Sequence, residues 1–169
     1  MKVPICTFDA RAGMLCPNCD AKLKSGHITK ADVDVSISLV RLASQIPELD
    51  RISLVRAHEV DSSLVIVLNT NDVVGLRRDK AITKKIEQAM GTKIWLVDAQ
   101  TTERKILDDL LYPVRILTVN QVWLPGGSKM TRAIIMGRRT ERFPIDLDQV
   151  KKIVKAVKGI ELLVEFEKQ

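Results

Sequence analysis

The sequence predicts an α+β protein in which a short cysteine-bearing element precedes two copies of one helix-and-strand module. Residues 84–91 have the pattern of a basic amphipathic helix that ends at a glycine, and residues 93–97 follow as an apolar strand. The same order returns in residues 151–159 and 160–164. A repeat of this kind indicates that a supersecondary unit is duplicated. The third observation is that no cysteine lies beyond Cys19.

These observations divide the chain into three parts. We expect an N-terminal element of residues 1–28 and two domains, residues 29–100 and 101–169, each with a three-stranded sheet packed by helices. A chain of 169 residues has room for one large domain or for two to three small ones, and the repeat favours the small ones. Its hydrophobic content of 46% is enough for such cores, and Val, Ile and Leu must do most of the packing because only 4% of residues are aromatic.

The first module begins with a helix that has a clear start and stop. Thr29 and Asp32 form a capping-box pattern, and Pro47 ends the apolar periodicity. A strand is also compatible with the alternation of Val33, Val35, Ile37 and Leu39, but the cap and the length favour the helix.

The rest of the first module alternates between strands and helices. Residues 51–56 alternate polar and apolar side chains as a half-buried strand does, and residues 64–68 read as a fully buried strand. Residues 69–72 are predicted to be a loop. A short helix, a longer helix over residues 80–90 and a strand over residues 93–97 complete the module.

The second module repeats this order with one helix replaced by a loop. We expect a helix, two strands joined by a Pro-Gly-Gly-Ser turn, a basic loop, a helix that starts at acidic residues and stops at Gly159, and a final strand. The first helix covers residues 102–111. The two strands cover residues 114–124 and 130–136, with the turn at 125–128 between them. The loop covers 137–144, the second helix 146–159 and the final strand 160–166.

This order resembles the type II KH fold, and the pairing of two copies resembles the archaeal NusA-like proteins over residues 30–168. The residues that carry the resemblance are 65–67, 71–73 and 86–97 in the first copy and 112–120 and 124–126 in the second. The resemblance implies a protein that binds RNA during transcription or translation.

One part of the KH pattern is altered in both copies. KH domains clamp the sugar-phosphate backbone with a GXXG loop, because glycine allows close approach. Here that loop falls on Arg77-Arg78-Asp79-Lys80, and in the second copy on Gly137-Arg138-Arg139-Thr140. We therefore expect phosphate contacts from long cationic side chains in the first copy, namely Arg77, Arg78, Lys80, Lys84 and Lys85.

A second basic surface is predicted in the other copy. One face of the last predicted helix carries Lys151, Lys155 and Lys158, with Lys152 beside them. A solvated lysine face is the common explanation of such a stripe. The neighbouring strand and loop add further cations, which makes a phosphate-tracking patch the alternative: Arg132, Arg138, Arg139 and Arg142. The two tryptophans, Trp95 and Trp123, are expected to be core residues of strands.

The cysteines predict a metal site. Cys6-x-x-Asp9 and Cys16-x-x-Cys19 have the spacing of paired knuckles that hold one tetrahedral zinc, with Asp9 where a fourth cysteine is usual. His27 is the other candidate for the fourth ligand, and three reduced thiols without a metal are the alternative. Because residues 1–28 have few large apolar side chains, a structural zinc in a knuckle or ribbon would hold them together.

The net charge indicates the kind of partner, and the absence of membrane or export signals indicates the cellular location. A net charge of +6 and a pI near 9.3 favour a polyanionic partner. No apolar stretch follows Met1, and the longest apolar run, residues 64–68, is far shorter than the roughly 20 residues that a membrane span needs. We expect a cytoplasmic protein without a membrane anchor.

The function we expect is that of a non-catalytic RNA-binding protein held in a large ribonucleoprotein, on the small ribosomal subunit near rRNA and mRNA. The alternatives are a NusA-like transcription elongation or termination factor that binds nascent RNA and RNA polymerase, and a KH-fold scaffold that binds proteins. A metal-dependent nuclease using Asp72, Asp79 or Glu87 is disfavoured because no carboxylate cluster converges. No P-loop, nucleophile elbow or HExxH motif indicates a small-molecule substrate.

Overall fold

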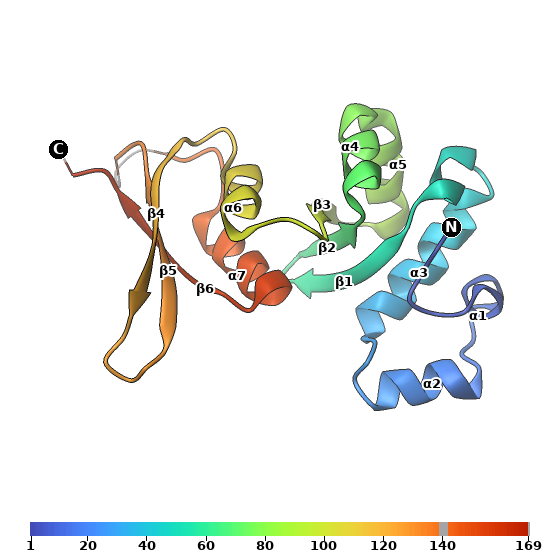
Figure 1. The fold of residues 1–169 in the computed structure, drawn as a ribbon. Helices are drawn as coiled ribbons and strands as arrows, with labels where there is room; N and C mark the ends of the chain where they lie inside the picture. Colours follow the sequence, from blue (N-terminus) through green and yellow to red (C-terminus); the bar gives the residue numbers. More distant parts are fainter. Residues whose placement is uncertain (139–141, 169) are drawn as a thin grey trace. The chain divides into compact units, whose positions relative to one another are not determined.

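The computed structural model describes residues 1–138 and 142–168, and the chain divides into two compact units, Met1–Gln100 and Thr101–Gln169 (Figure 1). The elements of the first unit are α1 (Thr7–Ala12), α2 (Pro17–Lys24), α3 (Lys30–Ala43), the 3-10 helix η1 (Pro47–Arg51), β1 (Leu54–Val60), β2 (Ser63–Leu68), α4 (Thr70–Arg78), α5 (Lys80–Met90) and β3 (Lys93–Asp98).

The sheet of the first unit has the order β1-β2-β3. Strands β1 and β2 are antiparallel, from Leu54 opposite Leu68 to Val60 opposite Ser63. Strands β2 and β3 are parallel, so the chain must cross over between them, and α4 and α5 form that crossover. The core combines Leu39 of α3, Ile66 of β2 and Ile86 of α5, all nearly or fully buried.

A buried carboxylate fixes α3 to the sheet. Asp32 accepts a hydrogen bond from the Thr29 backbone N–H, which completes the predicted capping box. Its Oδ1 accepts from the Ala57 backbone N–H at 2.7 Å, and its Oδ2 accepts from Arg56 Nη1 at 3.1 Å. Because every donor around this charge comes from α3's own cap or from β1, the carboxylate sets the position of the helix on the strand.

The N-terminal element belongs to the first unit and contains two short helices. Its apolar residues are few, and they pack with α3 in a cluster of Ile5, Ala10, Cys19, Ile28 and Val33. Its first residues also reach the sheet, because Lys2 forms a bridge with Ser53 beside β1, and Met1 and Val3 pack against the core of the first unit. The element is thus helical rather than a ribbon of strands, because both ligand pairs coincide with helix N-termini.

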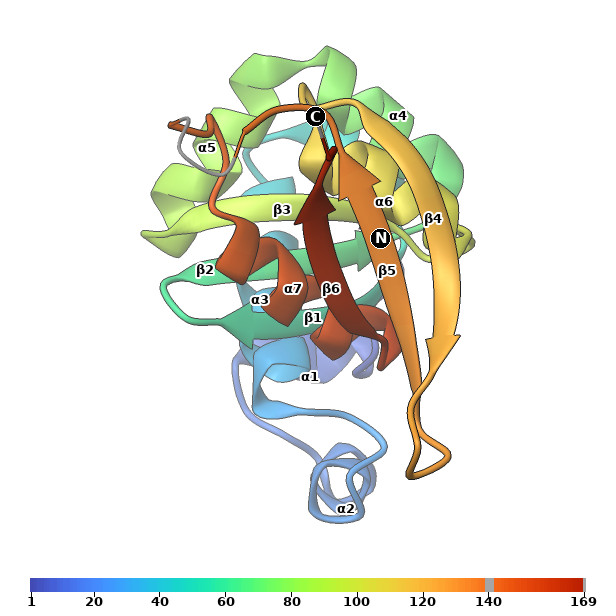
Figure 2. The ribbon, with the colours of Figure 1, turned by 90° about the vertical axis from the view of Figure 1, so that its left-hand side faces the viewer.

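The second unit repeats the sheet of the first. Its elements are α6 (Glu103–Leu111), β4 (Ile116–Trp123), β5 (Lys129–Ile135), α7 (Leu147–Lys158) and β6 (Glu161–Phe166). The sheet order is β4-β5-β6, with an antiparallel first pair and a parallel second pair (Figure 2). Helices α6 and α7 pack on the sheet and on each other, and Ala133, Ile135, Val150 and Ile153 are fully buried.

Most predicted elements agree with the structure, with two differences in the first unit. The predicted loop over residues 69–72 is wrong, because Asn69 is the N-cap of α4 and the helix begins at Thr70. The strand predicted from residue 51 begins at Leu54, since Pro47 starts the 3-10 turn that buries Leu49. In the second unit the segment before α7 is anchored by Phe143, whose ring lies 5.1 Å from that of Phe166.

No helix among the described residues is both long and apolar enough to cross a membrane.

Candidate metal centre and cationic surface

Four potential metal ligands meet where the first turns of two helices begin. Cys6 is the N-cap of α1 and Asp9 lies in its first turn, while Cys16 is the N-cap of α2 and Cys19 lies in its first turn. The repeated x-x spacing therefore places one ligand at the cap and the next three residues later in both helices. The positive ends of two helix dipoles lie beside the cluster, an arrangement that favours thiolate and carboxylate anions.

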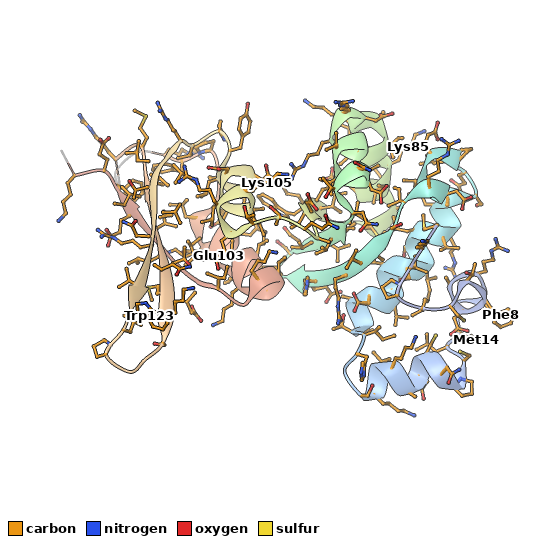
Figure 3. The ribbon with its side chains drawn as sticks, viewed as in Figure 1. Phe8, Met14, Lys85, Glu103, Lys105 and Trp123 are labelled. Atoms are coloured by element: carbon orange, nitrogen blue, oxygen red, sulfur yellow. The ribbon has the colours of Figure 1, made fainter. Side chains whose placement is uncertain are left out.

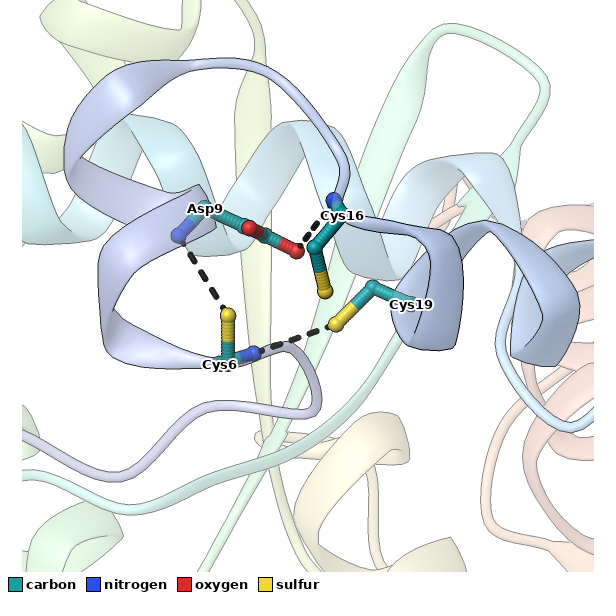
Figure 4. A group of neighbouring side chains, drawn as sticks. All are labelled: Cys6, Asp9, Cys16 and Cys19. Carbon is teal, nitrogen blue, oxygen red and sulfur yellow. Dashed lines mark hydrogen bonds between the residues drawn. The ribbon is translucent and has the colours of Figure 1, made fainter.

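The ligand atoms are close enough to share one ion. The three Sγ atoms and a carboxylate oxygen of Asp9 all lie within 4.8 Å of one another (Figure 4). Zinc–sulfur bonds of about 2.3 Å in a tetrahedron separate ligand sulfurs by about 3.8 Å. Small movements of the side chains would therefore complete the coordination. Hydrogen bonds from the Asp9 N–H to Cys6 Sγ and from the Cys6 N–H to Cys19 Sγ, each 3.4 Å, already orient the sulfurs.

Asp9 supports a metal site more directly than the cysteines do. The residue is completely buried, and its Oδ2 accepts a hydrogen bond of 2.9 Å from the Cys16 backbone N–H. Its Oδ1 is buried and has no hydrogen-bond partner among the described residues. A buried carboxylate oxygen without a partner is costly, and a cation would supply the missing interaction. The donor set, three sulfurs and one oxygen, suits zinc.

The two central ligands differ in protonation. The hydrogen bond from the Cys16 backbone is the largest of several that lower the pKa of Asp9 to about 2, so this carboxylate is ionised at neutral pH. Burial raises the pKa of the Cys19 thiol to about 12, and Asp9 acts in the same direction. A bound cation would therefore displace the proton of Cys19. His27 is outside the cluster, because its Nδ1 contacts Ser25 Oγ at 2.7 Å.

The first unit presents exposed cations on consecutive helices. We use the term α5 cationic surface for Arg78 at the end of α4 and Lys80, Lys84 and Lys85 on α5, all of them exposed. Among the described residues, none of these four forms an ion pair or a side-chain hydrogen bond. Arg77, predicted with them, donates a hydrogen bond of 2.9 Å to the Leu96 carbonyl. Lys85 is labelled in Figure 3.

The connection between α4 and α5 is a single residue, Asp79. Its Oδ1 accepts hydrogen bonds from the backbone N–H groups of Ala81 and Ile82, at 3.1 and 3.2 Å. Helix N-termini bind phosphate through such groups. Because the Asp79 carboxylate already occupies them, an anion that approaches α5 has the side chains of Arg78 and Lys80 as its available donors.

The predicted cations of the second unit have acidic neighbours. Arg132 donates from Nε to Glu165 Oε2 at 2.7 Å, and its Nη2 contacts the same oxygen. Lys151 lies 3.5 Å from Asp148, and Lys155 lies 2.5 Å from Glu161. Arg138 also has an interaction partner, and Arg139 lies outside the described residues. Arg142 is exposed and lines a shallow hollow of about 350 Å³ with Arg115 and Phe143.

The structure exposes several apolar side chains that the sequence analysis did not single out as sites. The prediction that Trp123 is a core residue is wrong, since 69% of it is exposed; Trp95 is partly buried. The Pro-Gly-Gly turn that follows Trp123 was the available signal, because a strand's last residue before a hairpin turn extends beyond the packed helices. Phe8 and Met14, in the N-terminal element, are 75% and 73% exposed (Figure 3).

Comparison with known proteins identifies a similar fold. No protein-family model matches the chain, and no curated protein matches it. A solved structure described as "Crystal structure of APE1850" has a TM-score of 0.50 and 16% sequence identity to it. The similarity covers 76% of this chain and 96% of that one. At this level of identity the likeness concerns the fold alone.

Proposed function

We propose that this chain is a non-catalytic RNA-binding protein built from two type II KH-like domains and an N-terminal zinc element. The observation that carries the proposal is the α5 cationic surface. Four exposed cations without carboxylate partners among the described residues lie along the first two turns of α5 and just before it, and Asp79 already caps the helix start. Such side chains suit phosphates at variable distances, and the arrangement needs no glycine clamp.

The repeated topology supports the KH-like assignment. Both sheets have one antiparallel and one parallel pair in the same order, and the first unit has two consecutive helices before its last strand. That helix pair is where a KH domain holds its phosphate-binding loop. The second unit has α7 alone among its described residues in the corresponding stretch, so we assign the main phosphate contacts to the first.

Binding to RNA over a range of salt concentrations tests this function. The purified chain should bind an unstructured RNA, with an affinity that falls as salt increases because phosphate contacts release counterions. Reversing Lys80, Lys84 and Lys85 to Glu should weaken that binding by at least about tenfold. An affinity for RNA that the triple reversal leaves unchanged would reject the α5 cationic surface as the contact. Incubation with labelled RNA and Mg²⁺ should leave the RNA intact, and cleavage would contradict a non-catalytic role.

The zinc assignment has its own test. Protein prepared without chelator should carry about one zinc per chain. Replacing Cys16 or Cys19 with Ser should release the metal and make residues 1–28 sensitive to protease, while both sheets stay folded. Replacing exposed Ser25 with Ala is the matched control, because it lies in the same element and outside the ligand cluster. Stoichiometric metal in the Cys19→Ser variant would contradict the assigned ligand set.

A protein partner is favoured by the surface of the N-terminal element. Phe8 and Met14 are two large apolar side chains that a small element leaves exposed, and a protein partner would bury them. A protein that binds RNA with one surface and a protein with another belongs in a ribonucleoprotein. We propose the small ribosomal subunit, with RNA polymerase and a purely protein-binding scaffold as alternatives.

Sedimentation of native extract at low salt separates these settings. The chain should move with the small subunit. Movement with RNA polymerase would support the transcription-factor alternative. A complex that survives RNase and contains protein alone would support the scaffold.

A further inference from the structure

An exposed tryptophan stands at the free end of the second unit's hairpin. Trp123 is the last residue of β4, and Leu124, 38% exposed, follows it (Figure 3). Tryptophan carries the largest apolar side chain and is buried in most folded proteins. The side chain is 69% exposed, so most of it is left uncovered. Because the side chain is mostly exposed, it contributes only a small part of the stabilisation that its burial would give.

The backbone around Trp123 is well ordered. Trp123 is paired with Lys129 across the antiparallel ladder of β4 and β5. The Leu124 N–H donates to the Ser128 carbonyl at 2.8 Å, and the Gly127 N–H donates to the Leu124 carbonyl at 2.9 Å. Gly127 adopts a φ of 80°, which a residue with a side chain adopts at a cost. The indole is therefore presented from a closed hairpin, so binding a partner would need little ordering of the backbone.

The sequence of the hairpin contains positive charges and no negative ones. Between Asp109 and Glu141 there is no acidic residue. The cations within this stretch are Arg115, Lys129, Arg132, Arg138 and Arg139. Lys129, directly opposite the tryptophan, is exposed, and the exposed amide side chains of Asn120 and Gln121 lie on the same strand. Acids of other elements lie nearby, since Gln121 Nε2 donates to Glu103 and Glu161 of β6 lies opposite Met130. Lys129 itself has no ion pair among the described residues, so the cation opposite the ring can meet an anionic partner.

An aromatic ring beside a cation on an acid-free strand has the chemistry that unpaired nucleotides require. A base stacks on the ring whatever its identity, and a lysine beside the ring can contact the neighbouring phosphate. We infer that Trp123 is a stacking platform for an unpaired base of single-stranded RNA, with Lys129 as its phosphate contact. This inference deepens the proposed RNA-binding function. It gives the second unit a contact that is independent of its acid-paired lysines on α7.

Fluorescence and affinity together test the platform. The full chain is titrated with an unstructured oligouridylate, and Trp123→Phe and Trp123→Ala are titrated in parallel. Stacking should quench emission in the native chain, and Trp123→Phe should still bind while it loses most of that quenching. Trp123→Ala should bind at least about fivefold more weakly, the range expected for loss of one stacked base. Thermal unfolding of each variant should match that of the native chain, since the side chain is exposed.

Tyr112→Ala provides the matched control. Tyr112 is 77% exposed in the same unit and lies outside the hairpin, so its removal should leave affinity unchanged. If Trp123→Ala and the native chain bind equally, and the triple reversal on α5 still weakens binding, the platform is rejected and the proposed function stands. If neither change affects binding, both the stacking platform and the α5 cationic surface are rejected as RNA contacts. A Trp123→Ala variant that keeps its RNA affinity but loses a co-sedimenting protein would reassign the ring to a protein interface.

Discussion

Helices α5 and α7 have almost the same sequence pattern and offer different charges to a partner. Each is capped by an aspartate whose Oδ1 accepts two backbone N–H groups, Asp79 in one and Asp146 in the other. Each ends at a glycine with positive φ, Gly91 at 68° and Gly159 at 66°. The difference lies in what surrounds the lysines. Carboxylates lie beside Lys151 and Lys155 of α7, whereas Lys80, Lys84 and Lys85 of α5 have no such partner among the described residues.

A count of lysines and arginines alone therefore overestimates how strongly a surface attracts nucleic acid. Exposed ion pairs contribute little to stability, about 0–1 kcal/mol each. They nevertheless reduce the positive potential that a phosphate would meet. On α7 the acids come from the helix itself, at Asp148, and from the following strand, at Glu161. We therefore propose that the first unit provides the main phosphate contacts, although α5 and α7 have similar sequence patterns.

The largest expected effect is on the stability of the first unit, through Asp32, the buried carboxylate that joins α3 to β1. Asp32→Asn should lower the free energy of unfolding of the first unit by about 3 kcal/mol, because it removes charge-assisted bonds to Arg56 and Ala57 within a dry site. Asp108→Asn in α6, whose pair with Arg104 is exposed, should change stability by less than about 0.5 kcal/mol. Urea unfolding measures both, and equal midpoints for the two variants would contradict this difference.

The next prediction removes the acids of the second unit. Glu161→Gln and Glu165→Gln together should free Lys155 and Arg132 and raise RNA affinity by about fivefold at low salt. Glu167→Gln is the control, because it removes the same charge from an exposed residue with no ion pair among the described residues. Filter binding at several salt concentrations measures the change. An increase for Glu167→Gln as large as that for Glu161→Gln alone would show that net charge, not pairing, sets the affinity.

A smaller change in RNA affinity is expected from substitutions at the two helix N-caps. Asp79→Asn keeps a good N-cap and removes a negative charge between Arg78 and Lys80, so RNA affinity should rise by about threefold. Asp146→Asn makes the same change on α7, whose Lys151 and Lys155 keep their acidic neighbours in this variant, and should leave affinity unaltered. Equal responses in a titration with the same RNA would remove the distinction between the two caps.

The smallest effect is a pH dependence confined to the first unit. Burial lowers the pKa of His58 below 6.5, Arg56 acts in the same direction, and Asp32 opposes them. The unfolded chain therefore binds a proton more readily than the folded one. Stability is full above pH 6.5 and falls as the pH drops through the folded pKa of His58. His58→Gln should flatten this dependence between about pH 7.5 and about pH 5.5, as measured by urea midpoints.

The sequence predicted the features that depend on local pattern. The capping box at Thr29 and Asp32, the glycine stops at Gly91 and Gly159, and the x-x spacing of the cysteines all depend on residues a few positions apart. The pairing of Arg132 with Glu165 and of Lys155 with Glu161 was not predicted, because it depends on strand register. The same is true of Trp123, whose exposure depends on how far the hairpin extends beyond its helices.

The metal element illustrates both cases. Spacing predicted Cys6, Cys16 and Cys19 and left Asp9 or His27 as the fourth candidate ligand, and the structure brings Asp9 into the cluster. The candidate ligands lie at two helix N-termini, where a knuckle or ribbon was expected. Spacing fixes which residues can reach one ion. It does not distinguish a turn between strands from the first turn of a helix, since both bring residues three apart onto one side.

Two matched neutralisations test the central claim most directly. One variant changes Lys80, Lys84 and Lys85 to Gln, and the other changes Arg132, Lys151 and Lys155 to Gln, so each variant has three fewer positive charges. The slope of log affinity against log salt, measured with one single-stranded RNA, should decrease by about 2 in the first variant, because each neutralised phosphate contributes about 0.7 to that slope. The second variant should change the slope by much less, because acids already neighbour those cations. Equal decreases, or a larger one in the second variant, would contradict the account.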